Sequence, residues 1–216
     1  MNLYVFPHAP YSRKVLLAIY EKGLKIEIET ISPHDPAAKE RLLGIYPIFT
    51  LPLLVLDEGA PMPESSIIVE HLDLSSAAEP RLLPADSKEA LHVRACDRLG
   101  DQLLAATAYL AFALGKPVDK QNVERIAMNR RKIRAVLDLV ERELDVSTFL
   151  HGDGLTLADL GPVCAVASLL SDGSLEGLEP WPGVERWFAR VTSRLSWQRI
   201  GDDCRAVPLP RGLSRR

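Results

Sequence analysis

The dipeptide Leu51-Pro52 could present backbone polar groups to a ligand. It opens the apolar run 51–56, although a proline within a strand removes one ladder hydrogen bond. A cis bond between Leu51 and Pro52 would turn the Leu51 N–H and C=O toward a bound molecule, and cis bonds before proline are rare and specific features. The alternative is a trans proline at the start of an edge strand.

A second pair, Glu64-Ser65, stands immediately before a predicted helix over residues 66–72. The N-terminus of a helix offers N–H groups and a partial positive charge, so it suits a carboxylate. Ser65 would add a hydroxyl donor to that carboxylate, and Glu64 could pair with an ammonium group. A carboxylate and an ammonium on one carbon describe an α-amino acid head group. The alternative is an N-cap serine after a surface glutamate.

The elements that would position these two pairs follow one another closely. Apolar runs and alternation predict strands, and apolar residues at helical spacing predict helices. The predicted order is β-α-β-α-β-(β)-α within 80 residues, with strands at 2–6, 25–31 and 51–56, helices at 12–22, 36–44 and 66–72, and a hairpin region at 57–63.

Beyond a serine-, alanine- and proline-containing stretch, no strand pattern recurs. Long helical periodicity runs through 91–114 and 123–144, and Thr156 with Asp159 forms the pattern of a capping box at the start of a third helix, flanked by Leu155 and Leu160 as a hydrophobic staple. We therefore predict an α/β domain followed by an all-α domain. The predicted ranges are 1–78, a linker at 79–86, a helical domain at 87–204 and a tail at 205–216.

Composition excludes several classes of function. The chain has 216 residues and a net charge of −3, so no strong positive field favours nucleic acid or an anionic membrane. No apolar run approaches the roughly 18 residues of a membrane span. Cys96, Cys164 and Cys204 form neither a disulfide framework nor a C-x-x-C pair, and the histidines show no metal-ligand spacing. We expect a cytoplasmic protein without a metal.

Three segments together resemble the cytosolic glutathione S-transferase family: Phe6 to Val15, Thr50 to Val55, and Glu64 to Ile68. The resemblance implies a thioredoxin-like N-terminal domain, an all-helical C-terminal domain and glutathione as co-substrate. It also implies that the backbone of Leu51, before a cis Pro52, pairs with the cysteinyl part of glutathione, and that Glu64 and Ser65 hold the γ-glutamyl head group. The Thr156-x-x-Asp159 pattern resembles the folding signature of the family's second domain.

The family's thiol-activating residue stands in the loop after the first strand, and here its serine or cysteine position is occupied by Ala9. Ser12 lies on the same helical face and is the first candidate for the missing hydroxyl. Tyr11 is the second candidate and His8 the third, and a helix N-terminus alone also lowers a thiol pKa. The nearest cysteine in the sequence is Cys96, so thiol transfer is disfavoured.

The expected function is addition of the glutathione thiolate to a small apolar electrophile, as in detoxification. Glutathione-dependent peroxidase, dehalogenase or isomerase activity, and a non-catalytic glutathione-binding or scaffold protein, are the alternatives. The resemblance further implies a homodimer in which helix 91–114 takes part in the interface. Asp97 or Asp101 would then reach the ligand of the other subunit.

Overall fold

The computed structural model describes residues 1–207. These divide into a first unit, residues 1–82 with 195–207, and a second unit, residues 83–194. The first unit holds a four-stranded mixed sheet of order β2-β1-β3-β4, in which β1 pairs parallel with β2 and antiparallel with β3. The strands are β1 (Asn2–Val5), β2 (Glu27–Thr30), β3 (Leu53–Val55) and β4 (Pro61–Met62).

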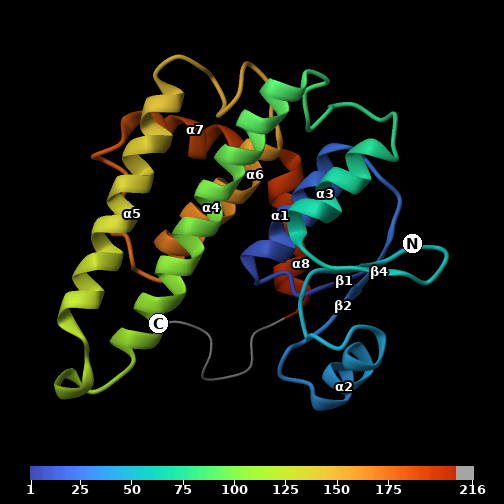
Figure 1. The fold of residues 1–216 in the computed structure, drawn as a ribbon, viewed down its shortest axis with the longest axis horizontal. Coiled ribbons are helices and arrows are strands. Elements are labelled where there is room, and N and C mark those ends of the chain that lie inside the picture. The colour runs from blue at the N-terminus through green and yellow to red at the C-terminus, as the bar shows by residue number, and fades with distance from the viewer. Residues whose placement is uncertain (208–216) are drawn as a thin grey trace. The chain divides into compact units, whose positions relative to one another are not determined.

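Three helices of the first unit cover the two faces of this sheet. Figure 1 shows α1 (Pro10–Glu21) and α3 (Ser65–Leu74) on one side and α2 (Pro36–Ile45) on the other. Side chains alternate along a strand, so Leu3 and Val5 are fully buried on one face, while Tyr4 joins the cluster that packs with α2. The predicted α/β, thioredoxin-like arrangement is confirmed.

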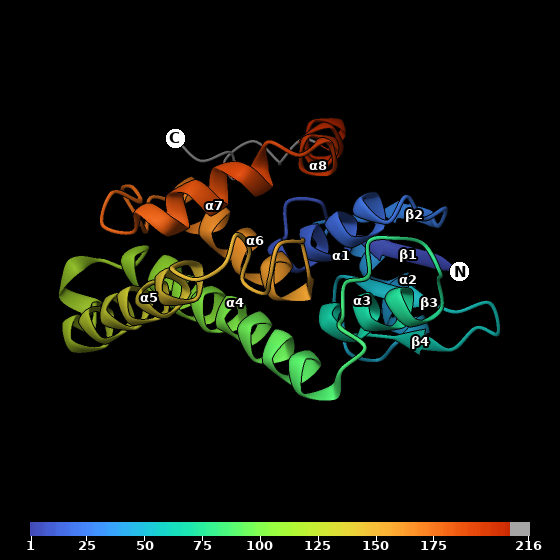
Figure 2. The same cartoon turned by 90° about the horizontal axis from the view of Figure 1, so that it is seen from above.

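The last helix, α8 (Leu195–Ala206), returns to the first unit and packs beside α1 (Figure 2). The hydroxyl of Tyr20 donates to Asp203 at 2.5 Å, and Ser196 donates to Glu21. The predicted ranges assign 195–204 to the helical domain and 205–216 to a tail, whereas α8 extends to Ala206 and shares its contacts with α1. Of the predicted tail, residues 208–216 lie outside the described residues.

The second unit is helical, as predicted, and contains α4 (Ser87–Leu114), a short 3-10 turn η1 (Val118–Lys120), α5 (Val123–Leu144), α6 (Leu157–Ser171) and α7 (Pro182–Thr192). Helix α6 is buried on almost every side and forms the core of this unit. It approaches α4 at two glycines, since a Cβ on Gly100 would lie 2.5 Å from the carbonyl carbon of Gly161. Only glycine permits this backbone approach.

The start of α6 is held by one buried carboxylate. Asp159 Oδ2 accepts the Thr156 N–H at 2.9 Å and its hydroxyl at 3.2 Å, and Oδ1 accepts from Leu150 N at 2.9 Å and from Trp187 Nε1 at 2.8 Å. The predicted reach of Asp159 back to Thr156 is confirmed. Burial raises the pKa of the Asp159 carboxyl, although the four hydrogen bonds oppose that shift.

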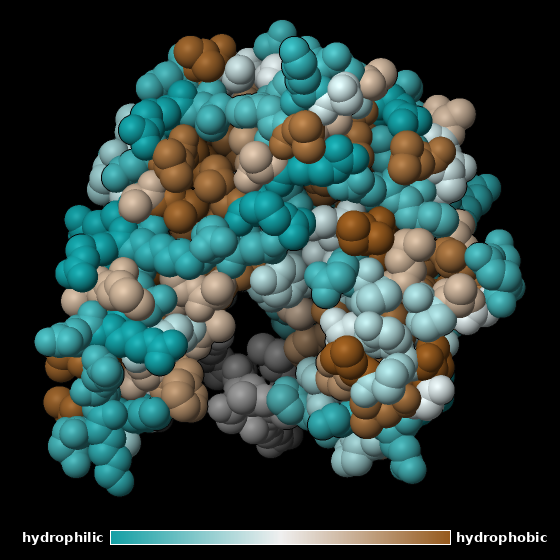
Figure 3. Space-filling view, viewed as in Figure 1, coloured by the Kyte–Doolittle hydropathy of each residue, from teal (hydrophilic) through white to brown (hydrophobic). Residues whose placement is uncertain are grey.

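On the face drawn in Figure 3, apolar side chains do not form one continuous band. Figure 3 shows hydrophilic residues over most of the visible face, with apolar residues in separate areas. None of the helices in residues 1–207 combines the length and the apolar composition that crossing a membrane requires.

Candidate functional site

The start of α3 is a helix N-terminus whose N-cap residue, Glu64, provides no side-chain cap. Its first residue, Ser65, is buried, with 7% exposure. Glu64 before it has φ 72° and ψ 108°, and within residues 1–207 it is the one non-glycine residue with a positive φ. Such a conformation costs roughly 1–3 kcal/mol and tends to occur at functional sites. The carboxylate site at this helix start stays a prediction.

A buried lysine lies beneath this helix start. Lys14 of α1 is 1% exposed, and its Nζ donates to Ser66 Oγ at 2.6 Å. Its charge adds to the partial positive charge of the α3 N-terminus. The sequence carries one signal for this burial, because Leu17 and Ala18, three and four residues later on the same helical face, are apolar. Nothing in the sequence indicates that the ammonium meets Ser66.

The peptide bond between Leu51 and Pro52 is cis, as predicted. Pro52 is buried directly before β3, and Leu51 packs against the core cluster on the α2 side of the sheet. The backbone pairing of Leu51 with a ligand stays a prediction.

The two predicted hydroxyls, both in the first turn of α1, differ in their surroundings. Ser12 is completely buried, and its Oγ accepts the Phe6 N–H at 3.2 Å, so it ties the end of β1 to α1. Tyr11 is 37% exposed. Ala9 is the N-cap residue of α1 and provides no side-chain cap. Of these two residues, Tyr11 is the more accessible to solvent.

The loop between β1 and α1 is bound by α8. Pro7 O accepts from Arg13 Nε at 2.9 Å and from Cys204 Sγ at 3.3 Å, and His8 Nε2 lies 2.7 Å from Val207 O. The cysteine that contacts this loop is therefore Cys204. The sequence did not indicate this contact, because Cys204 lies far from the loop along the chain. Burial raises the pKa of the Cys204 thiol although Arg13 opposes the shift, so this thiol is not activated.

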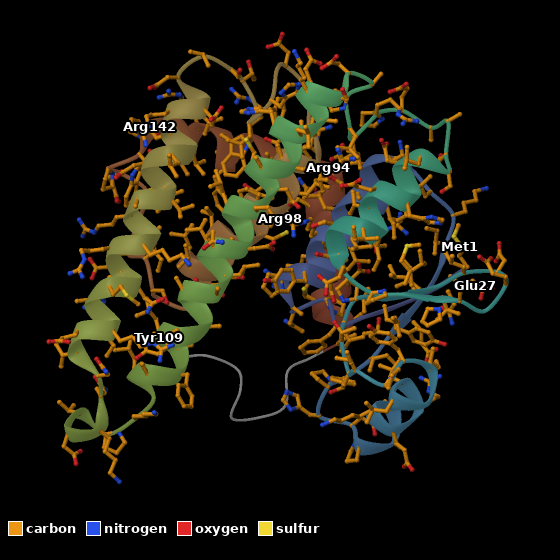
Figure 4. All side chains as sticks on the ribbon, viewed as in Figure 1. Met1, Glu27, Arg94, Arg98, Tyr109 and Arg142 are labelled. Carbon is orange, nitrogen blue, oxygen red and sulfur yellow. The ribbon has the colours of Figure 1, made fainter. Side chains whose placement is uncertain are left out.

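The two acidic residues predicted to reach another subunit both lie on α4 and share one arginine. Arg98, labelled in Figure 4, contacts Asp97 Oδ2 at 2.7 Å and Asp101 Oδ2 at 2.9 Å. The Asp97 side chain is fully buried, whereas 29% of the Asp101 side chain is exposed. Asp101 is the more accessible of the two.

In chemical terms, the first unit offers two helix starts without side-chain caps, at Ala9 and at Glu64, and a buried ammonium below the second. Uncapped helix starts stabilise anions. The start of α3 suits a carboxylate, and the start of α1 suits a thiolate. A ligand that carries both groups matches this arrangement.

Comparison with known proteins agrees with this chemistry. Residues 3–80 match the family model of the glutathione S-transferase N-terminal domain, and residues 99–194 match that of its C-terminal domain. The chain is 31% identical over 161 residues to the uncharacterized GST-like protein YibF of Escherichia coli, covering 74% of this chain and 78% of that protein. It is 30% identical over 194 residues to glutathione S-transferase D7 of Drosophila melanogaster, covering 87% and 82%.

A solved structure is similar over the whole length. The glutathione S-transferase of Methylobacterium radiotolerans, in complex with glutathione sulfonate, has a TM-score of 0.82 and 29% identity, covering 100% of this chain and 98% of that one. Both domain models match in the predicted order, and two relatives reach 30% identity over most of their length. The chain therefore belongs to the glutathione S-transferase family.

Proposed function

We propose that this protein binds glutathione and adds its thiolate to a small apolar electrophile. The observation that carries the proposal is the start of α3, where Ser65 opens an uncapped helix after the positive-φ residue Glu64. The buried Lys14 ammonium supports the same site, since it adds positive charge through Ser66. Relatives of the family and a structure in complex with glutathione sulfonate favour glutathione as the ligand.

In the proposed complex, the γ-glutamyl carboxylate accepts hydrogen bonds from the Ser65 hydroxyl and the first N–H groups of α3, and its ammonium pairs with Glu64. The backbone of Leu51, fixed by Pro52, pairs with the cysteinyl part. These contacts use a carboxylate, an ammonium and a peptide unit at separate places. They orient the sulfur before reaction, and orientation makes a large contribution to such catalysis.

The thiolate is proposed to form at the start of α1. A free thiol has a pKa of about 8.5 and is only slightly ionised at neutral pH, whereas a helix N-terminus lowers that pKa. Ala9 leaves this start without a side-chain cap, and Tyr11 is a partly exposed residue of the same turn that carries a hydroxyl. Ser12, the other candidate, is proposed to act by holding the loop, because its oxygen already accepts the Phe6 N–H.

A second candidate function is glutathione binding without conjugation. Ala9 favours it, because an alanine cannot donate a hydrogen bond to the sulfur at the position where relatives of this type carry a hydroxyl or a thiol. Glutathione-dependent peroxide reduction, dehalogenation and isomerisation use the same thiolate and are further outcomes of the same site.

One experiment separates these functions. The full chain is passed over glutathione-agarose and then assayed for conjugation of a chromogenic aromatic halide, with Ser65→Ala as the matched variant. Retention with conjugation supports the transferase, and retention without conjugation supports the binding protein. Failure of the wild type to be retained, together with equal behaviour of Ser65→Ala, contradicts the glutathione site itself.

We further propose a cytoplasmic homodimer that acts in detoxification. Within residues 1–207 none of the three cysteines forms a disulfide, in keeping with a reducing compartment. Apolar side chains are exposed on two helices, with Ile67 of α3 at 51% and Leu91 of α4 at 64%, and exposed apolar patches are typical of interfaces. Light scattering that gives twice the chain mass would support the dimer.

A further inference from the structure

Three side chains of different chemistry meet between α4 and α5, within the second unit. His92 and Cys96 lie one turn apart on α4, and Glu143 faces them from the last turn of α5. His92 Nε2 is 3.6 Å from Cys96 Sγ and 3.4 Å from Glu143 Oε2, and the three potential ligand atoms all lie within 4.8 Å of one another. Figure 4 labels Arg94 on α4 and Arg142 on α5, which are close in sequence to these three residues and show which part of each helix is meant.

These spacings are those of a metal tetrahedron. Zinc bonds of about 2.3 Å to sulfur, about 2.05 Å to nitrogen and about 2.1 Å to oxygen give tetrahedral edges of about 3.5 Å for S···N and about 3.4 Å for N···O. The observed edges of 3.6 Å and 3.4 Å agree with both values. The third distance, between the Cys96 sulfur and the Glu143 carboxylate, is within 4.8 Å. Two of the three distances therefore match a zinc site directly, and the third lies within reach of a side-chain adjustment of Glu143.

The distance between His92 and Glu143 is long for direct pairing. A charge-assisted hydrogen bond from an imidazolium to a carboxylate spans about 2.7–2.9 Å, which is shorter than the 3.4 Å between His92 and Glu143.

The cluster is also open on one side. Cys96 is 3% exposed and forms its base, whereas 45% of the His92 side chain and 38% of the Glu143 side chain reach solvent. The ring of His151 lies beside that of His92, with centroids 5.7 Å apart, so a second imidazole borders the opening. An ion can enter from solvent and keep one water as its fourth ligand.

We propose that His92, Cys96 and Glu143 bind one divalent transition-metal ion of the zinc class, with water in the fourth position. The donor set of imidazole, thiolate and carboxylate selects such ions over calcium or magnesium, which prefer oxygen alone. On binding, the Cys96 thiol transfers its proton to solvent and its sulfur bonds to the metal. The ion joins α4 to α5 and stabilises the second unit. This site is separate from the proposed glutathione site of the first unit.

The test uses the untagged full chain, stripped of metal with a chelator and titrated with Co²⁺. A tetrahedral thiolate site gives visible d–d bands and a near-ultraviolet sulfur-to-cobalt charge-transfer band. We expect both bands to saturate at one Co²⁺ per chain and to disappear when Zn²⁺ displaces it. Zinc is also expected to raise the melting temperature, because an ion that binds only the folded chain stabilises it.

Two ligand variants and two controls assign the bands. Cys96→Ser is expected to abolish the charge-transfer band, and His92→Ala to weaken Co²⁺ affinity by more than the roughly 10–100-fold caused by loss of a supporting residue. Cys204→Ser and His34→Ala, which lie in the first unit, are expected to bind as the wild type does. Absence of the charge-transfer band from the wild type overturns the proposal, as does its loss in Cys204→Ser. Circular dichroism shows whether each variant is folded, and Glu143→Gln provides a third ligand test if Cys96→Ser is not.

Discussion

The starts of α3 and α6 each carry a small hydroxyl residue and an acidic one, but in different arrangements. At α3 the N-cap is Glu64 and Ser65 is the first helical residue, whereas at α6 the N-cap is Thr156 and Asp159 follows three residues later. At α6 the carboxylate of Asp159 turns back and accepts hydrogen bonds from Thr156, and two further donors from Leu150 and Trp187 complete its environment. At α3 the N-cap residue Glu64 provides no such side-chain cap. In the proposed glutathione complex, a carboxylate of the ligand takes at α3 the place that Asp159 takes at α6.

The starts of α2, α4, α5 and α7 follow the pattern of α6. Side chains accept the first N–H groups of α2, α4 and α5, from Asp35, Asp86 and Asn122, and Glu141 of α5 accepts those of α7. Because unsatisfied N–H groups at a buried helix start are costly, the uncapped starts of α1 and α3 are exceptions that require an explanation. Ligand binding provides one.

The largest expected effect comes from removing the carboxylate of α6. Asp159→Ala leaves several buried donors without an acceptor, and each such group costs about 1–3 kcal/mol. We expect a loss of at least about 3 kcal/mol in the free energy of unfolding, measured by urea denaturation. Asp153→Ala, an exposed aspartate before the same helix, is the control and should change stability by less than about 0.5 kcal/mol. Equal effects would remove the distinction between the two helix starts.

The corresponding change at α3 should affect binding instead of folding. Ser65→Ala is expected to weaken glutathione binding by about 1–3 kcal/mol, the usual value of a hydrogen bond to a charged group. Titration calorimetry measures this loss, and thermal denaturation should show little change. Ser75→Ala at the other end of α3 is the matched control. Unchanged affinity in Ser65→Ala would mean that this serine serves only the helix.

A substitution of Lys14 tests whether the buried charge below α3 contributes to glutathione binding. Lys14→Met keeps the length of the side chain and removes the ammonium, a replacement that buried sites often tolerate. We expect the variant to fold and to bind glutathione more weakly by about 1 kcal/mol, in the range of charge effects at helix termini. Lys25→Met, at an exposed lysine of the first unit, is the control. Wild-type affinity in the Lys14 variant would restrict Lys14 to a packing role.

The smallest expected effects concern the start of α1. Ala9→Ser should lower the pKa of bound glutathione and raise the conjugation rate several-fold, since one added hydrogen bond is worth about 1 kcal/mol. Tyr11→Phe should lower that rate by a similar factor, whereas Ser12→Ala should act mainly on stability. Ultraviolet absorbance of the thiolate, followed against pH, reports the change. If neither Ala9→Ser nor Tyr11→Phe changes the pKa of bound glutathione or the conjugation rate, the glutathione sulfur does not lie near this loop.

Local sequence was sufficient for those features that depend on neighbouring residues. The proline at the mouth of β3, the Glu64-Ser65 pair before α3 and the Thr156-Asp159 pattern each specify their geometry within a few positions. The remaining features depend on residues far apart in the chain. Burial of Lys14 against Ser66 and the contact of Cys204 with Pro7 require the packed structure. Likewise, His92 and Cys96 show helical spacing, but their third partner, Glu143, comes from another helix.

The return of α8 has a consequence for how the chain is made. The first unit consists of two segments separated by the whole second unit. Since synthesis proceeds from the N-terminus, the sheet with α1 to α3 is made before the second unit, and α8 joins it only after the whole second unit has been translated. Seven residues of α1, including Val15, Leu16 and Ile19, are buried in the finished protein. Until α8 emerges, the nascent first unit therefore presents an incompletely covered α1 to the cell's chaperones.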